Sequence, residues 1–252
     1  MWLFDAPKTY TEMCKKIAQA VFCVTLVGLF VLSQISSDFA GVMKIISFNT
    51  ESEVIGIKLY IAYIYVPIAV SIIENIFKLH DKIQKIFELR TIFEGHVLFK
   101  AYIHALGLKN PHGKNICKIY RNNKKIRKTC LDHFYYYVSD VDPKIDAHDV
   151  HMALDAWCWV WILLDCIVVS VILCVVTVAL KLWVWDINKW LIIGLIIYSA
   201  VLAGMLLLQL MTTCKKYTKK EVLAAVKADE LEGNGALNDK VKKEIKNALH
   251  NK

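Results

Sequence analysis

The sequence predicts an all-α integral membrane protein with four transmembrane helices, a helical cytoplasmic domain between the second and third spans, and a helical C-terminal tail. Three observations support this prediction. The apolar residues AVILMFWYC make up 56% of the 252 residues, whereas soluble globular chains contain about 45–50%. Charged residues still make up 21%, so apolar and charged residues must occupy separate segments. Only 4 Pro and 10 Gly are present, which excludes collagen-like and Pro-rich chains.

Four apolar runs are each long enough to cross a bilayer, which takes about 20 residues. They cover residues 17–35, 54–77, 156–182 and 190–211. Four such runs in one chain argue against buried core helices of a soluble protein. The first run is longer than the roughly 7–15 apolar residues of a signal peptide, and Asp38 lies where a cleavage site needs a small residue. We therefore expect an uncleaved anchor.

The positions of the basic residues predict the orientation. Of the 31 Lys and Arg residues, 27 fall in the head before the first run, in the segment between the second and third runs, and in the tail. With four spans these parts share one side, so we expect a multi-pass protein of the cell inner membrane with both termini in the cytoplasm. The expected parts are residues 1–77 (head and first hairpin), 78–155 (basic helical domain), 156–211 (second hairpin) and 212–252 (amphipathic tail).

The segment 78–155 has a helical rather than a strand pattern. Apolar residues three and four positions apart predict a helix that continues from the second run to Leu106, with a kink at Gly95. The stripe expected to be buried includes Ile86, Phe87, Phe93 and Val97. The side chains expected to be exposed on the same helix are Lys82, Lys85 and Glu88.

Further helices are expected to begin outside the membrane. One covers Ile116 to Val138, and another starts at Pro143 and enters the third span without a break. Thr218 and Glu221 fit a T-x-x-E capping box, which predicts that a tail helix begins there.

Two carboxylates inside the apolar runs, Asp165 and Glu74, are the candidate intramembrane site. A charge near the middle of a bilayer costs about 2.5–3.5 kcal/mol on insertion scales, so it should not face lipid. Asp165 would line a water-filled pore, where a ring of carboxylates favours cations, or be protonated at a helix interface. The alternative is an interfacial Asp165 that reaches the cytoplasm.

The basic run KIYRNNKKIRK is the candidate ligand site. It could bind the phosphates of a nucleotide, a nucleic acid or lipid headgroups, without reading a base sequence. The alternative is positive-inside charge on a solvated helix. The phosphate-binding candidates are Lys118, Arg121, Lys124, Lys125, Arg127 and Lys128.

The hypotheses that this protein is an enzyme depend on short sequence motifs. Arg127 and His133 form the R-x5-H spacing of HEPN ribonucleases, in which His acts as general acid or base and Arg stabilises phosphate. His148, His151 and Asp155 would share a helix face as metal ligands, but the spacing lacks the other ligands of known zinc helices. Two HD dipeptides lack the remaining ligands of a phosphohydrolase. The eight cysteines form no CxxC motif, and we expect no cofactor, no metal site and no disulfide.

The stretch 74–99, ENIFKLHDKIQKIFELRTIFEGHVLF, resembles a pattern in multi-span membrane effectors of CBASS-like anti-phage defence systems in bacteria. The resemblance implies a homo-oligomer that forms a pore or disrupts the bilayer when a cytoplasmic activating protein or nucleotide signal acts on it. The alternatives are a membrane-anchored HEPN-like ribonuclease or phosphohydrolase, and a non-catalytic membrane scaffold for a soluble partner. The matching residues are His80, Asp81, Lys82, Ile83, Phe87, Leu89, Arg90 and Phe93.

Overall fold

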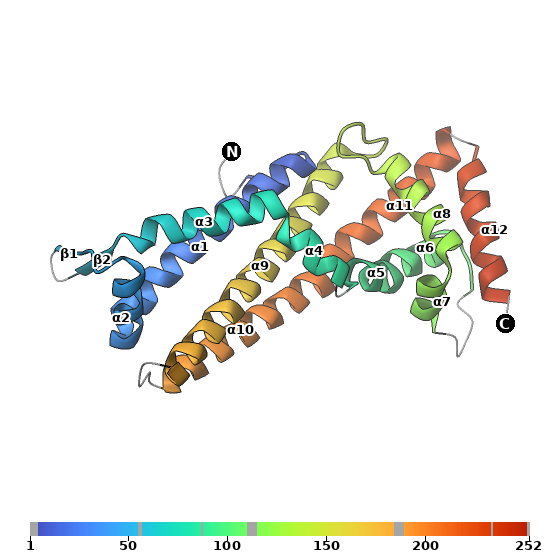
Figure 1. Ribbon diagram of the computed structural model, residues 1–252. Coiled ribbons are helices and arrows are strands. Elements are labelled where there is room, and N and C mark those ends of the chain that lie inside the picture. Colours follow the sequence, from blue (N-terminus) through green and yellow to red (C-terminus); the bar gives the residue numbers. More distant parts are fainter. Residues whose placement is uncertain are drawn as a thin grey trace. The chain divides into compact units, whose positions relative to one another are not determined.

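The computed structural model describes residues 5–54, 57–86, 88–109, 115–183, 189–232 and 234–250. Most of them are helical, so the all-α fold class is confirmed (Figure 1). Two strands, β1 (Glu51–Val54) and β2 (Ile57–Tyr60), form an antiparallel hairpin between α2 and α3. The helices are α1 (Tyr10–Ile35), α2 (Ser37–Ile46), α3 (Ala62–Phe77), α4 (Leu79–Ile86), α5 (Leu89–Phe93), the π-helix η1 (Glu94–Leu98), α6 (Phe99–Ala105), α7 (Ile116–Asn122), α8 (Lys124–Tyr137), α9 (Ala147–Trp183), α10 (Lys189–Gln209), the π-helix η2 (Leu210–Cys214), α11 (Lys215–Glu232) and α12 (Ala236–His250).

Three helices within the described residues are long and apolar enough to cross a membrane. They are Tyr10–Gln34, Ala147–Ala179 and the continuous helix Lys189–Glu232. Together they indicate a membrane protein. The continuous helix has 44 residues and would be roughly 66 Å long at 1.5 Å per residue, about twice the hydrocarbon thickness. Its apolar part is α10, whereas α11 is rich in lysine.

The second expected span differs from the structure. Its first residues form the hairpin, in which Glu51 pairs with Tyr60 and Val54 with Ile57. The alternation of apolar and polar residues from Ile57 to Tyr60 favours a strand. The remaining helix, α3, has 16 residues and would be roughly 24 Å long, below the ~30 Å hydrocarbon thickness. A helix throughout residues 54–77 is therefore wrong.

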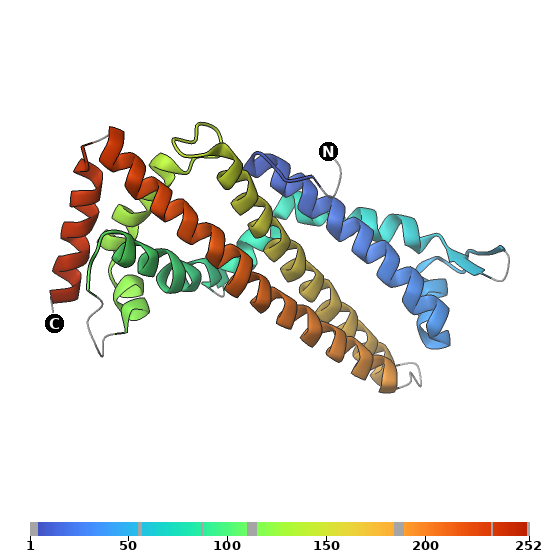
Figure 2. The same cartoon turned by 180° about the vertical axis from the view of Figure 1, so that it is seen from behind.

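The chain divides into two compact units. We call the first the apolar unit; it consists mainly of Cys14–His80 and Cys158–Leu208. The second, the polar unit, consists of Ala6–Met13, Asp81–Trp157 and Gln209–Lys252. In the apolar unit, α9 and α10 run side by side (Figures 1 and 2) and are joined by a hydrogen bond between the Ser170 and Ser199 hydroxyls, 2.7 Å apart.

A second packed region of the apolar unit surrounds Tyr63 of α3. Its ring makes edge-on contacts with Phe30, at 5.8 Å between centroids, and with Tyr60, at 5.6 Å. Its hydroxyl hydrogen-bonds to Ser33 of α1. These contacts pack α3 and β2 against α1 and α2, so the hairpin is part of the apolar core.

The helix expected to continue from the second run to Leu106 is interrupted. Lys78 ends α3 with a left-handed backbone, φ 44°, and Glu88 precedes α5 with φ 48°. The expected kink at Gly95 is a π-helical turn, η1. There a Cβ on Gly95 would lie 3.5 Å from the Cα of Cys117, an ordinary van der Waals distance, so η1 packs directly against α7.

The expected burial on this segment is confirmed in part. Phe93 and Val97 are buried, and the three charged side chains are exposed as expected. The expected burial of Ile86 is wrong, because 74% of its surface is exposed. It lies at the end of α4, before the chain changes direction at Glu88, so the helical periodicity does not continue through it. Phe87 lies outside the described residues.

Other expected boundaries also shift. The helix expected from Ile116 to Val138 is two helices, separated at Asn123, whose side chain accepts a hydrogen bond from the Ile126 amide. The expected helix start at Pro143 is wrong, because α9 begins only at Ala147, whereas its expected continuity into the third span is confirmed. The capping box is wrong: Thr218 and Glu221 lie buried inside α11, because η2 continues the helix from α10.

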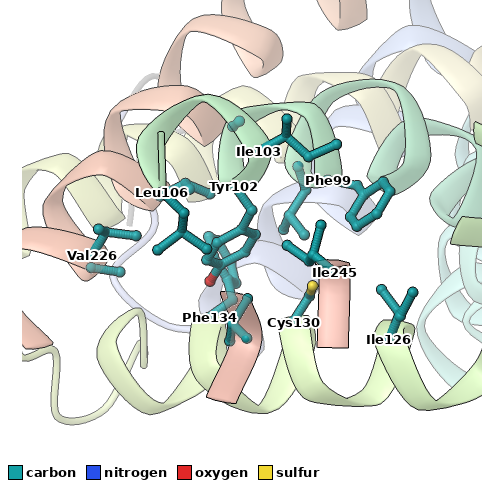
Figure 3. Packing of buried hydrophobic residues seen from close by; sticks show 14 of the residues in the cluster. Phe99, Tyr102, Ile103, Leu106, Ile126, Cys130, Phe134, Val226 and Ile245 are labelled. Carbon is teal, nitrogen blue, oxygen red and sulfur yellow. The ribbon is translucent and has the colours of Figure 1, made fainter. Parts of the chain in front are cut away.

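The core of the polar unit lies between α6, α8, α11 and α12. Figure 3 shows the side chains of Tyr102, Phe134, Cys130 and Ile245 converging from different helices. Tyr102 and Ile245 are fully buried. This core holds the polar groups described next in fixed positions.

Candidate functional site

His133 of α8 is enclosed in the core of the polar unit, with 2% of its surface exposed. Its Nδ1 lies 2.8 Å from the Tyr102 hydroxyl and its Nε2 lies 3.0 Å from Oδ1 of Asn238. The Asn238 amide nitrogen donates to the Val226 carbonyl, so its oxygen faces the ring and accepts from Nε2. The Tyr102 hydroxyl then donates to Nδ1. Burial lowers the pKa of His133, which keeps the ring neutral.

Asp229 of α11 lies next to this arrangement and is 1% exposed. Its carboxylate accepts hydrogen bonds from the Tyr137 hydroxyl, at 2.8 Å, and from the Asn238 backbone amide, at 2.7 Å. Asn238 lies in the first turn of α12, so Asp229 acts as a cap supplied by another helix. These buried bonds fasten α12 to α8 and α11.

The structure does not bring Arg127 to His133. Six positions on an α-helix place two side chains on different faces, and Arg127 does not line the cavity of about 480 Å³ beside His133. Both ring nitrogens of His133 are already in hydrogen bonds. His133 therefore acts as a core histidine in this conformation.

The histidines of α9 lie at the surface. His148 is exposed and His151 is half-buried. Within the described ranges, no three His, Cys, Asp or Glu side chains are grouped closely enough to hold a metal ion. Asp149, the acid of one HD dipeptide, instead pairs with Lys220 of α11 at 2.6 Å. Asp81, the acid of the other, accepts a hydrogen bond from the Tyr10 hydroxyl.

Three of the six basic candidates meet at one cavity of about 960 Å³ in the polar unit. Arg121 instead pairs with Glu88 at 2.7 Å. Arg127 is half-buried and Lys128 is exposed. The cavity lies where α7 and α8 face α12, and its lining consists of Asn115, Lys118, Ile119, Asn122, Asn123, Lys124, Lys125, Glu244, Asn247 and Ala248.

Both carboxylates that were expected inside the membrane are buried in the apolar unit. Asp165 of α9 is 1% exposed and Glu74 of α3 is 3% exposed. The chain itself therefore covers Asp165. Lys16 of α1 is also 1% exposed; its Nζ donates to the Asp5 carbonyl and lies 5.3 Å from the ring of Trp159. In the sequence, Lys16 is one of the three lysines of the head before the first apolar run, and no local signal predicts its burial.

The family of the chain follows from its sequence as a whole. A family model described as the YmfE protein family matches residues 9–247. The chain belongs to the YmfE protein family. No curated protein and no solved structure matches this YmfE-family chain. The comparisons do not connect it to CBASS-like effectors.

Several functional candidates of this YmfE-family protein were not identified from sequence. Asp229 and Asn238 carried no signal, because their partners lie far away in the chain. Glu244 and Asn247, which line the cavity between α7, α8 and α12, were expected only to be part of a Lys-rich surface helix. The asparagines at the α7 and α8 starts were identifiable: Asn115 and Asn123 both accept hydrogen bonds as N-caps.

Proposed function

We propose that this protein is an oligomeric membrane pore or membrane-disrupting effector that is closed in the present conformation and opens when a cytoplasmic signal acts on the polar unit. The observation that carries the proposal is the burial of Asp165. A carboxylate enclosed in an apolar helix is costly, and intramembrane acids of this kind commonly mark ion or proton pathways. Repacking of α9 would expose Asp165 to a water-filled path, where it would favour cations.

The shared helices support a link between signal and pore. The residues of α9 up to Trp157 belong to the polar unit, and those from Cys158 belong to the apolar unit. Asp165 is eight residues beyond Trp157, or roughly 12 Å along the helix. The second connection, from α10 to α11, contains the π-helix η2. Such turns often occur at functional sites.

We further propose four crossings, with α3 as the short one, in a cell inner membrane with cytoplasmic termini. A local thinning of the bilayer would accommodate its length. Three crossings by α1, α9 and α10 would still place residues 78–155 and the tail on one side. The two topologies differ in the side on which the head lies and in the side on which the segment between α1 and α3 lies. Four crossings put the three head lysines inside, as the positive-inside rule favours.

Reconstitution in liposomes tests the pore. The purified protein should conduct cations when activated, and Asp165→Asn should change cation selectivity or conductance while the oligomer survives. Asp155→Asn, on the same helix but in the polar unit, is the matched control and should behave like the parent. If neither the parent protein nor the two variants conduct ions, the membrane scaffold is favoured instead. The proposed biological role is anti-phage defence, which is tested by phage challenge of cells with and without the protein.

A further inference from the structure

The cavity between α7, α8 and α12 combines cationic and amide side chains. Among the described lining residues, Lys118, Lys124 and Lys125 contribute three ammonium groups and Glu244 contributes one carboxylate. The lining therefore has a formal excess of two positive charges. Four asparagines supply further donors. Ammonium and amide groups are the side chains that hydrogen-bond phosphate oxygens.

The backbone adds to this positive potential. Helix α8 has 14 residues and begins at the cavity, with Lys124 and Lys125 in its first turn. Asn123 already caps the Ile126 amide at this start, but the start of a helix still carries partial positive charge, which favours anions. Here it coincides with a cluster of lysines and a cavity. The three features together point to an anionic ligand.

The size of the cavity limits the ligand. A volume of about 960 Å³ is at the upper end of small-molecule sites, which occupy about 300–1,000 Å³. It exceeds what one phosphate needs, whereas a chain of phosphoryl groups can reach several lysines at once. The lining offers few apolar side chains, Ile119 and Ala248, so recognition depends mainly on charge.

Glu244 occupies part of this site. Its Oε1 lies 2.8 Å from Nζ of Lys125, and the lysine side chain is 74% exposed while the glutamate is 17% exposed. An ion pair with such an exposed partner contributes little, so a ligand of higher charge can displace it. Glu244 lies on α12 beside the buried Ile245.

We propose that this cavity binds a ligand carrying a chain of phosphoryl groups, such as inorganic triphosphate or a nucleoside triphosphate, and that Glu244 of α12 is its built-in competitor for Lys125. The inference rests on the proposed function only in identifying this ligand with the cytoplasmic signal. The binding itself is independent of any conductance.

Calorimetric titration of the full-length protein in detergent micelles, with inorganic triphosphate as the probe, tests the site. Lys118→Gln and Lys124→Gln should each weaken binding roughly tenfold, as expected for one lost hydrogen bond between charged groups. Glu244→Gln should strengthen binding several-fold, because the competitor loses its charge. Lys128→Gln is the matched control, on α8 but outside the cavity, and should leave the affinity unchanged.

The outcomes separate the site from general surface charge. An equal loss of affinity in Lys128→Gln would overturn the proposal, as would unchanged binding in Glu244→Gln or no binding by the parent. Competition by phosphatidylglycerol added to the micelles, but not by ATP, would identify a lipid headgroup as the source of the phosphate and overturn the soluble ligand. Binding that follows these expectations without any ion flux would refute the pore and leave this site in place.

Discussion

Replacing Asp229 by Ala should detach α12 from the polar unit. The carboxylate accepts hydrogen bonds from the Tyr137 hydroxyl at 2.8 Å and from the Asn238 amide at 2.7 Å. A hydrogen bond to a charged group contributes about 1.5–3 kcal/mol, and a buried group left without its partner costs a comparable amount. Loss of both bonds should therefore destabilise the docked state of α12 by about 3–5 kcal/mol, a large share of the ~5–15 kcal/mol typical of a domain.

Hydrogen–deuterium exchange of the full-length protein measures this loss directly. Local opening that is easier by about 3–5 kcal/mol should accelerate exchange of the α12 amides by a few hundred-fold or more, since about 1.4 kcal/mol is a factor of ten. Tyr137→Phe removes one bond and should produce a smaller change. Glu230→Ala, an exposed neighbour on α11, should change protection by less than about 0.5 kcal/mol.

A result in which Asp229→Ala leaves α12 as protected as in the parent would refute the reasoning. It would mean that the apolar face of α12, centred on Ile245, holds the helix without the polar bonds. Equal effects of Asp229→Ala and Glu230→Ala would also refute it, because the effect would then reflect lost charge on α11 rather than the buried contacts.

Three other measurements test separate parts of the structure. Burial lowers the pKa of His133 below its ordinary value of 6.5, so its neutral form stabilises the fold above that pH and this contribution is lost as pH falls through the folded pKa. The parent protein should therefore melt at a higher temperature than His133→Gln by a margin that shrinks between about pH 7.5 and 5. A margin that stays constant with pH would contradict this expectation. Phe93→Asp should lower the level of the protein in cells sharply, because Phe93 packs edge-on against Trp157 with ring centroids 4.7 Å apart. The control Ile86→Asp, at an exposed position, should accumulate normally. Equal levels of the two variants would show that the packing of Phe93 is dispensable. With four crossings, a cysteine introduced by Lys8→Cys lies in the cytoplasm, so a membrane-impermeant maleimide should not label it in intact cells. Labelling from outside would refute four crossings and support three.

The fold was predictable wherever the signal was local. Hydrophobic length is a property of consecutive residues, so the first, third and fourth apolar runs coincide with long helices. The same reasoning failed for residues 54–77, because a composition count does not distinguish the alternating strand from Ile57 to Tyr60 from a helix. It failed at Thr218 and Glu221 because a start signal has no meaning where η2 already continues the helix.

The candidate site was predictable only in part. Asp165 stood out because it is charged within an apolar run, and the lysines stood out because they belong to one short basic run, residues 118–128. Which lysines act together depends on α12, which brings Glu244 within 2.8 Å of Lys125. A linear sequence contains no local pattern that pairs these two residues.

The sequence by itself determined that this is a largely helical chain with membrane-spanning segments and a basic remainder, because length, hydrophobicity and charge are read from neighbouring residues. Only the tertiary structure decided that His133 is a core residue bonded to Asn238, 105 positions away, and that Tyr137 bonds Asp229, 92 positions away. Burial and hydrogen bonding depend on which helices pack together. The docking of α12 on α8 and α11 therefore fixed the chemical state of groups that the sequence alone left open.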